Sequence, residues 1–234
     1  MFPKHSHNNV EQGYAHVESA FNDYLARTGT KLTEQDRLTL RLYMYATVAA
    51  ETGNFTPAVE QPNRTNTSHP LLPEFRRPGD VVPPFNTYAF RNGNEGINDA
   101  QTYRGRGYVQ ITGKKNYAYY GVAAGLHDLP HNPNKAAEPK NAAALLVAYV
   151  MEAEKGGHNN RARILNALNK GDMIAAREVV NGSNHHHLPN GLDNFVNAYA
   201  KGLKTTHPNT DRAVKELQHK EGTQQAVLKR GTQS

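Results

Sequence analysis

The sequence predicts a mainly α-helical (α+β) protein with one small β element. Apolar residues recur at three- and four-residue steps over most of the chain, a long segment rich in proline and asparagine interrupts them, and one glycine- and arginine-rich block alternates like a strand. The 234 residues, 37% of them apolar, suffice for one domain with a hydrophobic core. We expect this domain to span residues 1–208, with its core at about 33–205, and residues 209–234 to form a basic, partly helical or flexible tail.

Two helices are predicted in the first quarter of the chain. The first runs from about Val10 to Arg27 and stops before Gly29. The second can be capped by the hydroxyl group of Thr33 and continues to Glu51. Glu51 therefore lies on the last turn of a largely apolar helix, which is an unusual place for a surface carboxylate.

The periodicity disappears between Asn54 and Gln101, where prolines and polar residues predict a long irregular loop. The block from Tyr103 to Thr112 is expected to form a short strand or hairpin. Further helices are predicted over Lys115–Tyr120, Pro139–Glu154, Arg161–Asn169, Asp172–Val180, Leu192–Leu203 and Thr210–Gln218.

Composition excludes several classes of protein. The chain has no cysteine, which excludes a disulfide scaffold, a cysteine nucleophile and a thiolate metal site. No apolar run is long enough to span a membrane, and no secretory signal peptide is visible, so we expect synthesis in a cytoplasm and later delivery to the site of action. The formal net charge of +6 favours an anionic polymer as partner, which could be a nucleic acid, a cell-wall glycan or a membrane surface.

Two carboxyl groups suggest acid–base chemistry. Burial at the end of an apolar helix disfavours the charged form of a carboxyl group, which would raise the pKa of Glu51 toward that of a general acid. Glu60 follows nine positions later on the loop, where a carboxylate can remain ionised. Two carboxyl groups in different environments are what glycosidic-bond hydrolysis requires. Spacing alone does not establish this role.

Five ordered motifs strengthen this interpretation. They are YRGRGYVQITG at 103–113 followed by KKNY, AAETGNF at 49–55, YAFRNGNEGIND at 88–99, HNP with AAEP at 131–139, and VNG at 180–182. Together they resemble the motifs of the family 19 glycoside hydrolases, the chitinase-like enzymes that include many phage endolysins. The resemblance implies a lysozyme-like helical domain with a long loop lining a cleft, no cofactor and an inverting reaction. The absence of cysteine favours the endolysin branch.

The resemblance also assigns residues. It implies that Glu51 is the general acid, that Glu60 is the second carboxylate and that Thr112 helps to hold the attacking water. Glu74, Glu95 and Asp99 remain alternatives for the second carboxylate. The implied substrate-binding residues are amides, aromatic rings and one guanidinium group: Gln110, Asn116, Asn181, Tyr103, Tyr117 and Arg104.

The predicted function is the hydrolysis of β-1,4 bonds in bacterial peptidoglycan by a monomeric enzyme that needs no metal. Chitin hydrolysis, a lytic transglycosylase reaction and an inactive wall-binding module remain alternatives, and nucleic-acid binding is not expected. An inverting site would place the two carboxyl groups roughly 6.5–9.5 Å apart. We interpret His185–His187 as a solvated loop rather than a metal site, Arg104 and Arg106 as a structural turn whose guanidinium groups pair with cleft carboxylates, and the basic tail as a surface for an anionic wall or simply a solubilising segment.

Overall fold

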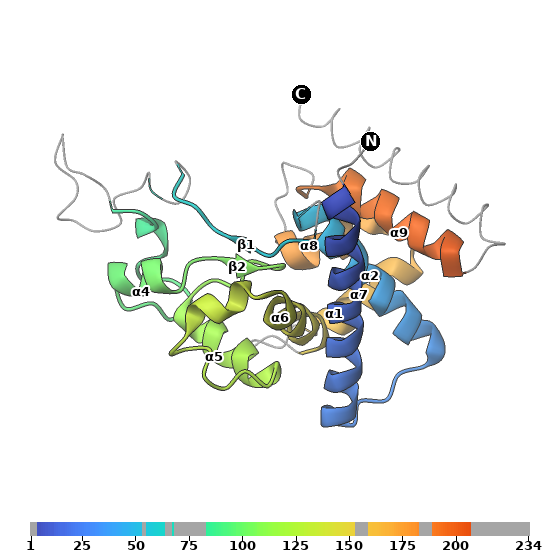
Figure 1. Ribbon diagram of the computed structural model, residues 1–234, viewed down its shortest axis with the longest axis horizontal. Helices are drawn as coiled ribbons and strands as arrows, with labels where there is room; N and C mark the ends of the chain where they lie inside the picture. Colours follow the sequence, from blue (N-terminus) through green and yellow to red (C-terminus); the bar gives the residue numbers. More distant parts are fainter. Residues whose placement is uncertain are drawn as a thin grey trace. The chain divides into compact units, whose positions relative to one another are not determined.

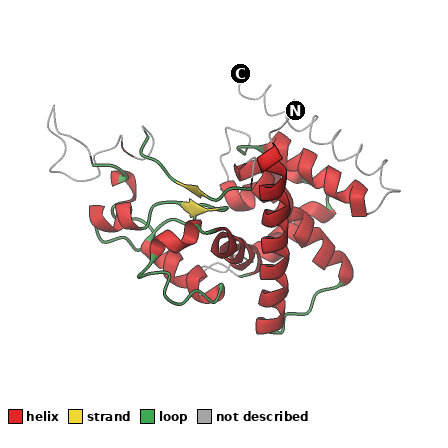
Figure 2. Ribbon diagram, viewed as in Figure 1, coloured by secondary structure: helices red, strands yellow, loops and turns green. Residues whose placement is uncertain are grey.

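The computed structural model describes residues 4–52, 55–63, 67, 83–152, 159–182 and 189–206. The chain divides into two compact units, one drawn from Met1–Phe55 with Tyr149–Ser234 and the other from Thr56–Ala148. We call these unit 1 and unit 2. Helices dominate the described residues and the only strands among them are short, so the predicted mainly α fold with a small β element is confirmed (Figures 1 and 2).

Unit 1 is helical throughout its described residues. Its core forms largely where α2 packs along α9, and there the rings of Tyr43 and Phe195 meet edge to face with centroids 5.5 Å apart. Both side chains are fully buried, as are Leu40 and Val48 of α2. The helices are α1 (Lys4–Thr28), α2 (Glu34–Thr52), α7 (Asn160–Asn169), α8 (Met173–Asn181) and α9 (Leu192–Thr206).

Side-chain caps fix where three of these helices begin. The hydroxyl oxygen of Thr33 accepts a hydrogen bond from Asp36 N at 3.1 Å, which confirms the predicted cap of α2. Asn159 and Asp172 cap α7 and α8 in the same way, each accepting a bond from the backbone three residues on. The Thr33 cap fixes where α2 begins, and Glu51 then falls on the last turn of that helix.

Unit 2 contains the small sheet and shorter helices. The strands β1 (Ala58–Val59) and β2 (Arg106–Gly107) pair antiparallel, with Ala58 opposite Gly107 and Val59 opposite Arg106. The strand predicted in the 103–112 block is therefore present, but its partner comes from the segment predicted to be irregular. The other elements are η2 (Asn86–Tyr88), α4 (Ile97–Thr102), α5 (Lys114–Ala123), η3 (Pro133–Ala137) and most of α6 (Pro139–Met151).

Several sequence expectations need adjustment. The segment 54–101 contains β1, η2 and the start of α4, and α6 ends at Met151 rather than at Glu154, which lies outside the described residues. The tail at 209–234, with its predicted helix at Thr210–Gln218, also lies outside them. None of the described helices combines the length and the apolar composition needed to cross a membrane.

Candidate active site

Glu51 lies on the last turn of α2, as predicted, and is held there by an arginine that the sequence analysis did not assign to the site. Arg177 Nη2 donates to Glu51 Oε1 at 2.6 Å. The side chain of Glu51 is 19% exposed and that of Arg177 only 1%. A guanidinium–carboxylate contact of this kind is a charge-assisted hydrogen bond, a partner for Glu51 that burial alone does not predict.

Arg177 is fixed by contacts on several sides. Its Nε and Nη2 donate to the carbonyl oxygen of Asn190 at 3.0 and 2.9 Å, and its guanidinium group lies 5.9 Å from the ring centre of Phe195. Because the side chain is buried and doubly bonded to the backbone, it presents Nη2 to Glu51 in one orientation. Arg177 stands among the apolar residues of α8, between Ala176 and Val179, and a buried charge in an apolar helix is the signal that could have identified it.

The chain just after Glu51 is fastened to α1. Phe55 is buried, with a φ of 60°, and its ring lies 4.5 Å from that of Tyr14. A Cβ added to Gly13 would lie 2.5 Å from Cδ1 of Phe55, so the ring occupies the space that a larger residue would fill. The helix α1, which precedes the expected core, thus fixes Phe55, four residues after Glu51.

Glu60 follows β1 in unit 2, and both of its carboxylate oxygens accept hydrogen bonds. Tyr88 Oη donates to Oε1 at 2.8 Å, and Gly105 N donates to Oε2 at 3.0 Å. The backbone N–H of Glu60 in turn donates to the carbonyl oxygen of Gly105 at 2.8 Å. Burial, followed by the hydrogen bond to Glu60, raises the pKa of Tyr88 to about 12, so its hydroxyl remains a donor at neutral pH.

Glu51 and Glu60 belong to different units, so their expected separation stays a prediction. Within unit 2 the structure brings Glu60 together with the segment that carries Gln110 and Thr112. Gln110 Nε2 donates to the carbonyl oxygens of Ala58 and Gly107, at 3.2 and 2.9 Å, and thereby joins the two strands. The backbone at Gln110 has a φ of 48°, a strained value for a residue with a side chain and one that is enriched at functional sites.

Thr112 and Asn116 are half-buried and bonded to nearby carbonyl oxygens. Thr112 Oγ1 donates to the carbonyl oxygen of Gln110 at 2.8 Å, which leaves the lone pairs of its hydroxyl oxygen as acceptors. Asn116 Nδ2 donates to the carbonyl oxygen of Thr112 at 2.9 Å. These bonds fix both side chains, and their proposed contacts with water and sugar stay predictions.

The two tyrosines expected to offer ring faces to sugars are buried instead. Tyr117 is 0% exposed and Tyr103 9%, and their rings pack against each other with centroids 5.4 Å apart. Tyr103 Oη donates to the carbonyl oxygen of Pro130, and Tyr117 Oη to that of Arg104. The ring of Tyr117 is fully buried and that of Tyr103 nearly so, so neither offers a face to a pyranose, and both support the 103–113 block.

The arginines of that block form the predicted structural turn, but their hydrogen-bond partners are carbonyl oxygens and an aromatic hydroxyl. Arg104 Nη1 donates to the carbonyl oxygen of Gln101, and its guanidinium group lies 5.7 Å from the ring centre of Phe85. Arg106 is buried and donates to Thr102 O, Arg104 O, Tyr117 Oη and Asn134 Oδ1. Within the described part of the chain neither arginine forms an ion pair with a carboxylate, so the expected pairing is corrected.

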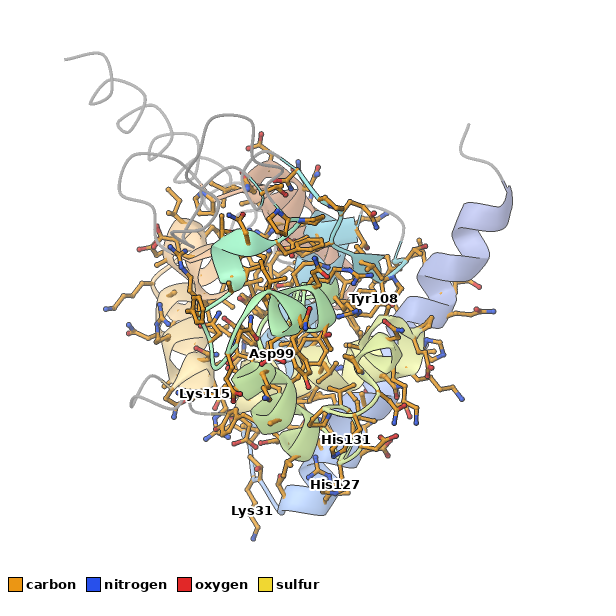
Figure 3. All side chains as sticks on the ribbon, turned by 90° about the vertical axis from the view of Figure 1, so that its left-hand side faces the viewer. Lys31, Asp99, Tyr108, Lys115, His127 and His131 are labelled. Carbon is orange, nitrogen blue, oxygen red and sulfur yellow. The ribbon has the colours of Figure 1, made fainter. Side chains whose placement is uncertain are left out.

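Two of the alternative carboxylates are bound to a lysine. Lys114 Nζ lies 3.2 Å from Glu95 Oε1 and 3.4 Å from Asp99 Oδ2, and Asp99 also accepts a bond from the backbone N–H of Glu95. Figure 3 labels Asp99 among the side chains of unit 2. The hydrogen bonds to Glu95 and Asp99 raise the pKa of Lys114. Glu74, the third alternative, lies outside the described residues.

Of the remaining predicted residues, only Asn181 is described by the structure. Asn181 is exposed at the last position of α8, and His185–His187 lie outside the described residues. Among the residues that are described, no cluster of histidine and acidic side chains could hold a metal ion.

Comparison with known proteins gives similar structures only. No protein-family model and no curated protein matches the chain. The crystal structure of chitinase C from Streptomyces griseus HUT6037 is similar with a TM-score of 0.48 and 18% identity, covering 82% of this chain and 68% of that one. A mutant of chitinase C gives a TM-score of 0.47 and 16% identity over the same shares. The resemblance of the motifs to family 19, and to its endolysin branch, stays a prediction.

Proposed function

We propose that this protein is a glycoside hydrolase that cleaves the β-1,4 bonds between amino sugars in bacterial peptidoglycan. The observation that carries the proposal is the state of two carboxylates nine positions apart. Glu51 is bonded to a buried guanidinium group, and Glu60 is bonded through both oxygens. Fixed carboxylates of this kind are the reactive groups of most glycosidases.

In this proposal Glu51 is the general acid. It donates a proton to the glycosidic oxygen of the leaving sugar, and the negative charge that develops on its carboxylate is stabilised by Arg177.

Glu60 acts as the second carboxylate. It orients a water molecule, accepts its proton as the water oxygen attacks the anomeric carbon, and stabilises the positive charge that develops on the sugar ring. The hydroxyl oxygen of Thr112, whose own proton is donated to Gln110 O, accepts a hydrogen bond from the same water. Two separate carboxylates favour hydrolysis over a lytic transglycosylase reaction, which requires only one acid and adds no water.

The test is the mass of the products. Folded wild-type protein is incubated with purified peptidoglycan and, in parallel, with chitin oligomers, and the products are analysed by mass spectrometry. The proposal predicts muropeptides that have gained one water for each bond cleaved. Anhydro ends would indicate a transglycosylase, cleavage of chitin alone would change the substrate, and no cleavage of either polymer would favour a wall-binding module.

A further inference from the structure

We propose that Tyr88 is the positioning residue of Glu60 and that, together with the backbone N–H of Gly105, it holds this carboxylate in one orientation. The inference rests on the proposed function, since it assigns how the second carboxylate is prepared for the reaction. Neither residue was assigned to the site from the sequence, although both lie in motifs that the sequence analysis identified.

Two donors bind the carboxylate of Glu60. Tyr88 Oη bonds to Oε1 and Gly105 N to Oε2, so each carboxylate oxygen has its own donor, and the donors come from separate segments of unit 2. Two bonds to different oxygens fix both the position and the plane of a carboxylate, which one bond does not. Hydrogen bonds donated to a carboxylate also stabilise its charged form.

Tyr88 is itself held in place by neighbouring residues. Asn94 is buried, its Nδ2 donates to the carbonyl oxygen of Tyr88 at 2.9 Å, and its Oδ1 accepts from Lys114 N at 2.9 Å. The ring of Tyr88 also stacks on that of Phe85, with centroids 6.5 Å apart. Tyr88 is thus fixed to the start of α5 through one buried amide, and its hydroxyl is directed at Glu60 from a rigid base.

Gly105 leaves little space beside the carboxylate of Glu60. A Cβ there would lie 3.0 Å from Glu60 Oε2, 3.3 Å from Glu60 Cβ and 2.8 Å from Gln110 Oε1. The carboxylate therefore lies close to this glycine, and an added Cβ would require both Glu60 Oε2 and Gln110 Oε1 to shift. The glycine is required by this close approach rather than by its backbone angles.

The surroundings of Glu60 contain further charged and titratable groups. Burial is the largest influence on the pKa of both Tyr88 and Tyr117. Besides it, the positive charge of Arg91 lowers the pKa of Tyr88, and the negative charge of Glu60 raises that of Tyr117. The guanidinium groups of Arg106 and Arg104 lower the pKa of Tyr117. None of these arginines and tyrosines changes its charge between about pH 4 and pH 8.

The experiment compares Tyr88→Phe with Tyr45→Phe in the full chain. Tyr45 Oη donates to Glu18 Oε2 at 2.8 Å, and burial with that bond raises the pKa of Tyr45 to about 12, so the control removes an equivalent contact elsewhere. Carboxyl ¹³C NMR gives the midpoint of each glutamate titration. In Tyr88→Phe the Glu60 midpoint is expected to rise by about one pH unit, whereas in Tyr45→Phe only that of Glu18 rises.

Activity gives the second readout. On peptidoglycan, Tyr88→Phe should lower kcat about tenfold with little change in KM, and its loss of activity at acid pH should begin at a higher pH than in wild type. Tyr45→Phe should match wild type in both respects. An unmoved Glu60 midpoint, or a loss of activity only in proportion to the loss of folded protein, would overturn the proposal.

The glycine supplies an independent variant. Gly105→Ala should lower kcat at least as much as Tyr88→Phe, because the added Cβ displaces the carboxylate. Gly96→Ala is its control, since a Cβ at that position would meet nothing within 4 Å. Equal activity of the two alanine variants would contradict the proposal. If wild type cleaves no polymer, the proposed function fails, and the NMR midpoints still decide whether Tyr88 fixes Glu60.

Discussion

Arg177 and Glu51 are 126 positions apart in the chain, and their side chains meet in an ion pair of 2.6 Å inside unit 1. The pair joins the end of α2 to the middle of α8. It holds the proposed acid in a fixed place, and it stabilises the carboxylate that proton donation would leave behind.

The first prediction concerns the stability of this pair. Arg177→Met removes a buried partner and leaves the carbonyl oxygen of Asn190 and the carboxylate of Glu51 without it, so the free energy of unfolding should fall by about 3–5 kcal/mol. Urea denaturation measures this change. The control is Lys135→Met, which removes the ion pair of equal length, 2.6 Å, between Lys135 and Asp128. The side chains of these two residues are 45% and 50% exposed. The control should unfold like wild type, and equal losses in the two variants would contradict the account.

The second prediction tests the contact between Gly13 and Phe55 by a reversal of sign. Alanine forms helices better than glycine, so Gly13→Ala should stabilise α1 by about 0.5–1 kcal/mol if nothing obstructs it. In wild type the new Cβ meets the Phe55 ring at 2.5 Å, so the substitution should instead lower the free energy of unfolding. In a Phe55→Gly background, which removes the Cβ at 2.7 Å as well as the ring, the same substitution should raise it. Stabilisation in both backgrounds would show that the ring does not occupy this space.

The third prediction concerns stability at alkaline pH. Burial raises the pKa of Tyr108 and Tyr199 to about 12, and burial with a hydrogen bond to a carboxylate does the same for Tyr45 and Tyr88. Unfolded tyrosines lose their protons near pH 10, so above that pH the unfolded chain binds fewer protons than the folded one. The free energy of unfolding should therefore fall between about pH 10 and pH 12. Tyr45→Phe should reduce this fall, and a flat profile would contradict the burial described.

The fourth prediction concerns the stereochemistry of the reaction. An inverting site needs room for water between carboxyl groups roughly 6.5–9.5 Å apart, whereas a retaining site places them roughly 5–5.5 Å apart. With Glu60 acting on water rather than on the sugar, the first product should be the α-anomer, which ¹H NMR detects before mutarotation. Early formation of the β-anomer would make Glu60 a nucleophile.

The helices were predictable because local signals determine them. Thr33 begins α2 and the apolar periodicity carries it to Glu51, and both features are visible in the sequence. The pairing of Ala58–Val59 with Arg106–Gly107 was not, because a two-residue strand has too few side chains to show a period.

The site was predictable only in part, for a related reason. The motifs single out Glu51 and Glu60 as candidates, but they do not show which groups bond to them. Arg177 approaches Glu51 from a helix far along the chain, and the hydroxyl of Tyr88 reaches Glu60 across unit 2. Tyr103 and Tyr117 were assigned to sugars because aromatic residues serve both cores and binding surfaces, and only their burial distinguishes the two uses.

The most direct test of the central claim compares wild type with Glu51→Gln on purified peptidoglycan. Glutamine retains an oxygen that can accept the bond from Arg177, so the variant should fold, but it has no acidic proton to donate. We expect water-added muropeptides from wild type, and a rate lower by at least about 100-fold from the folded variant. Equal rates of release from the two proteins would show that Glu51 is not the acid of this reaction.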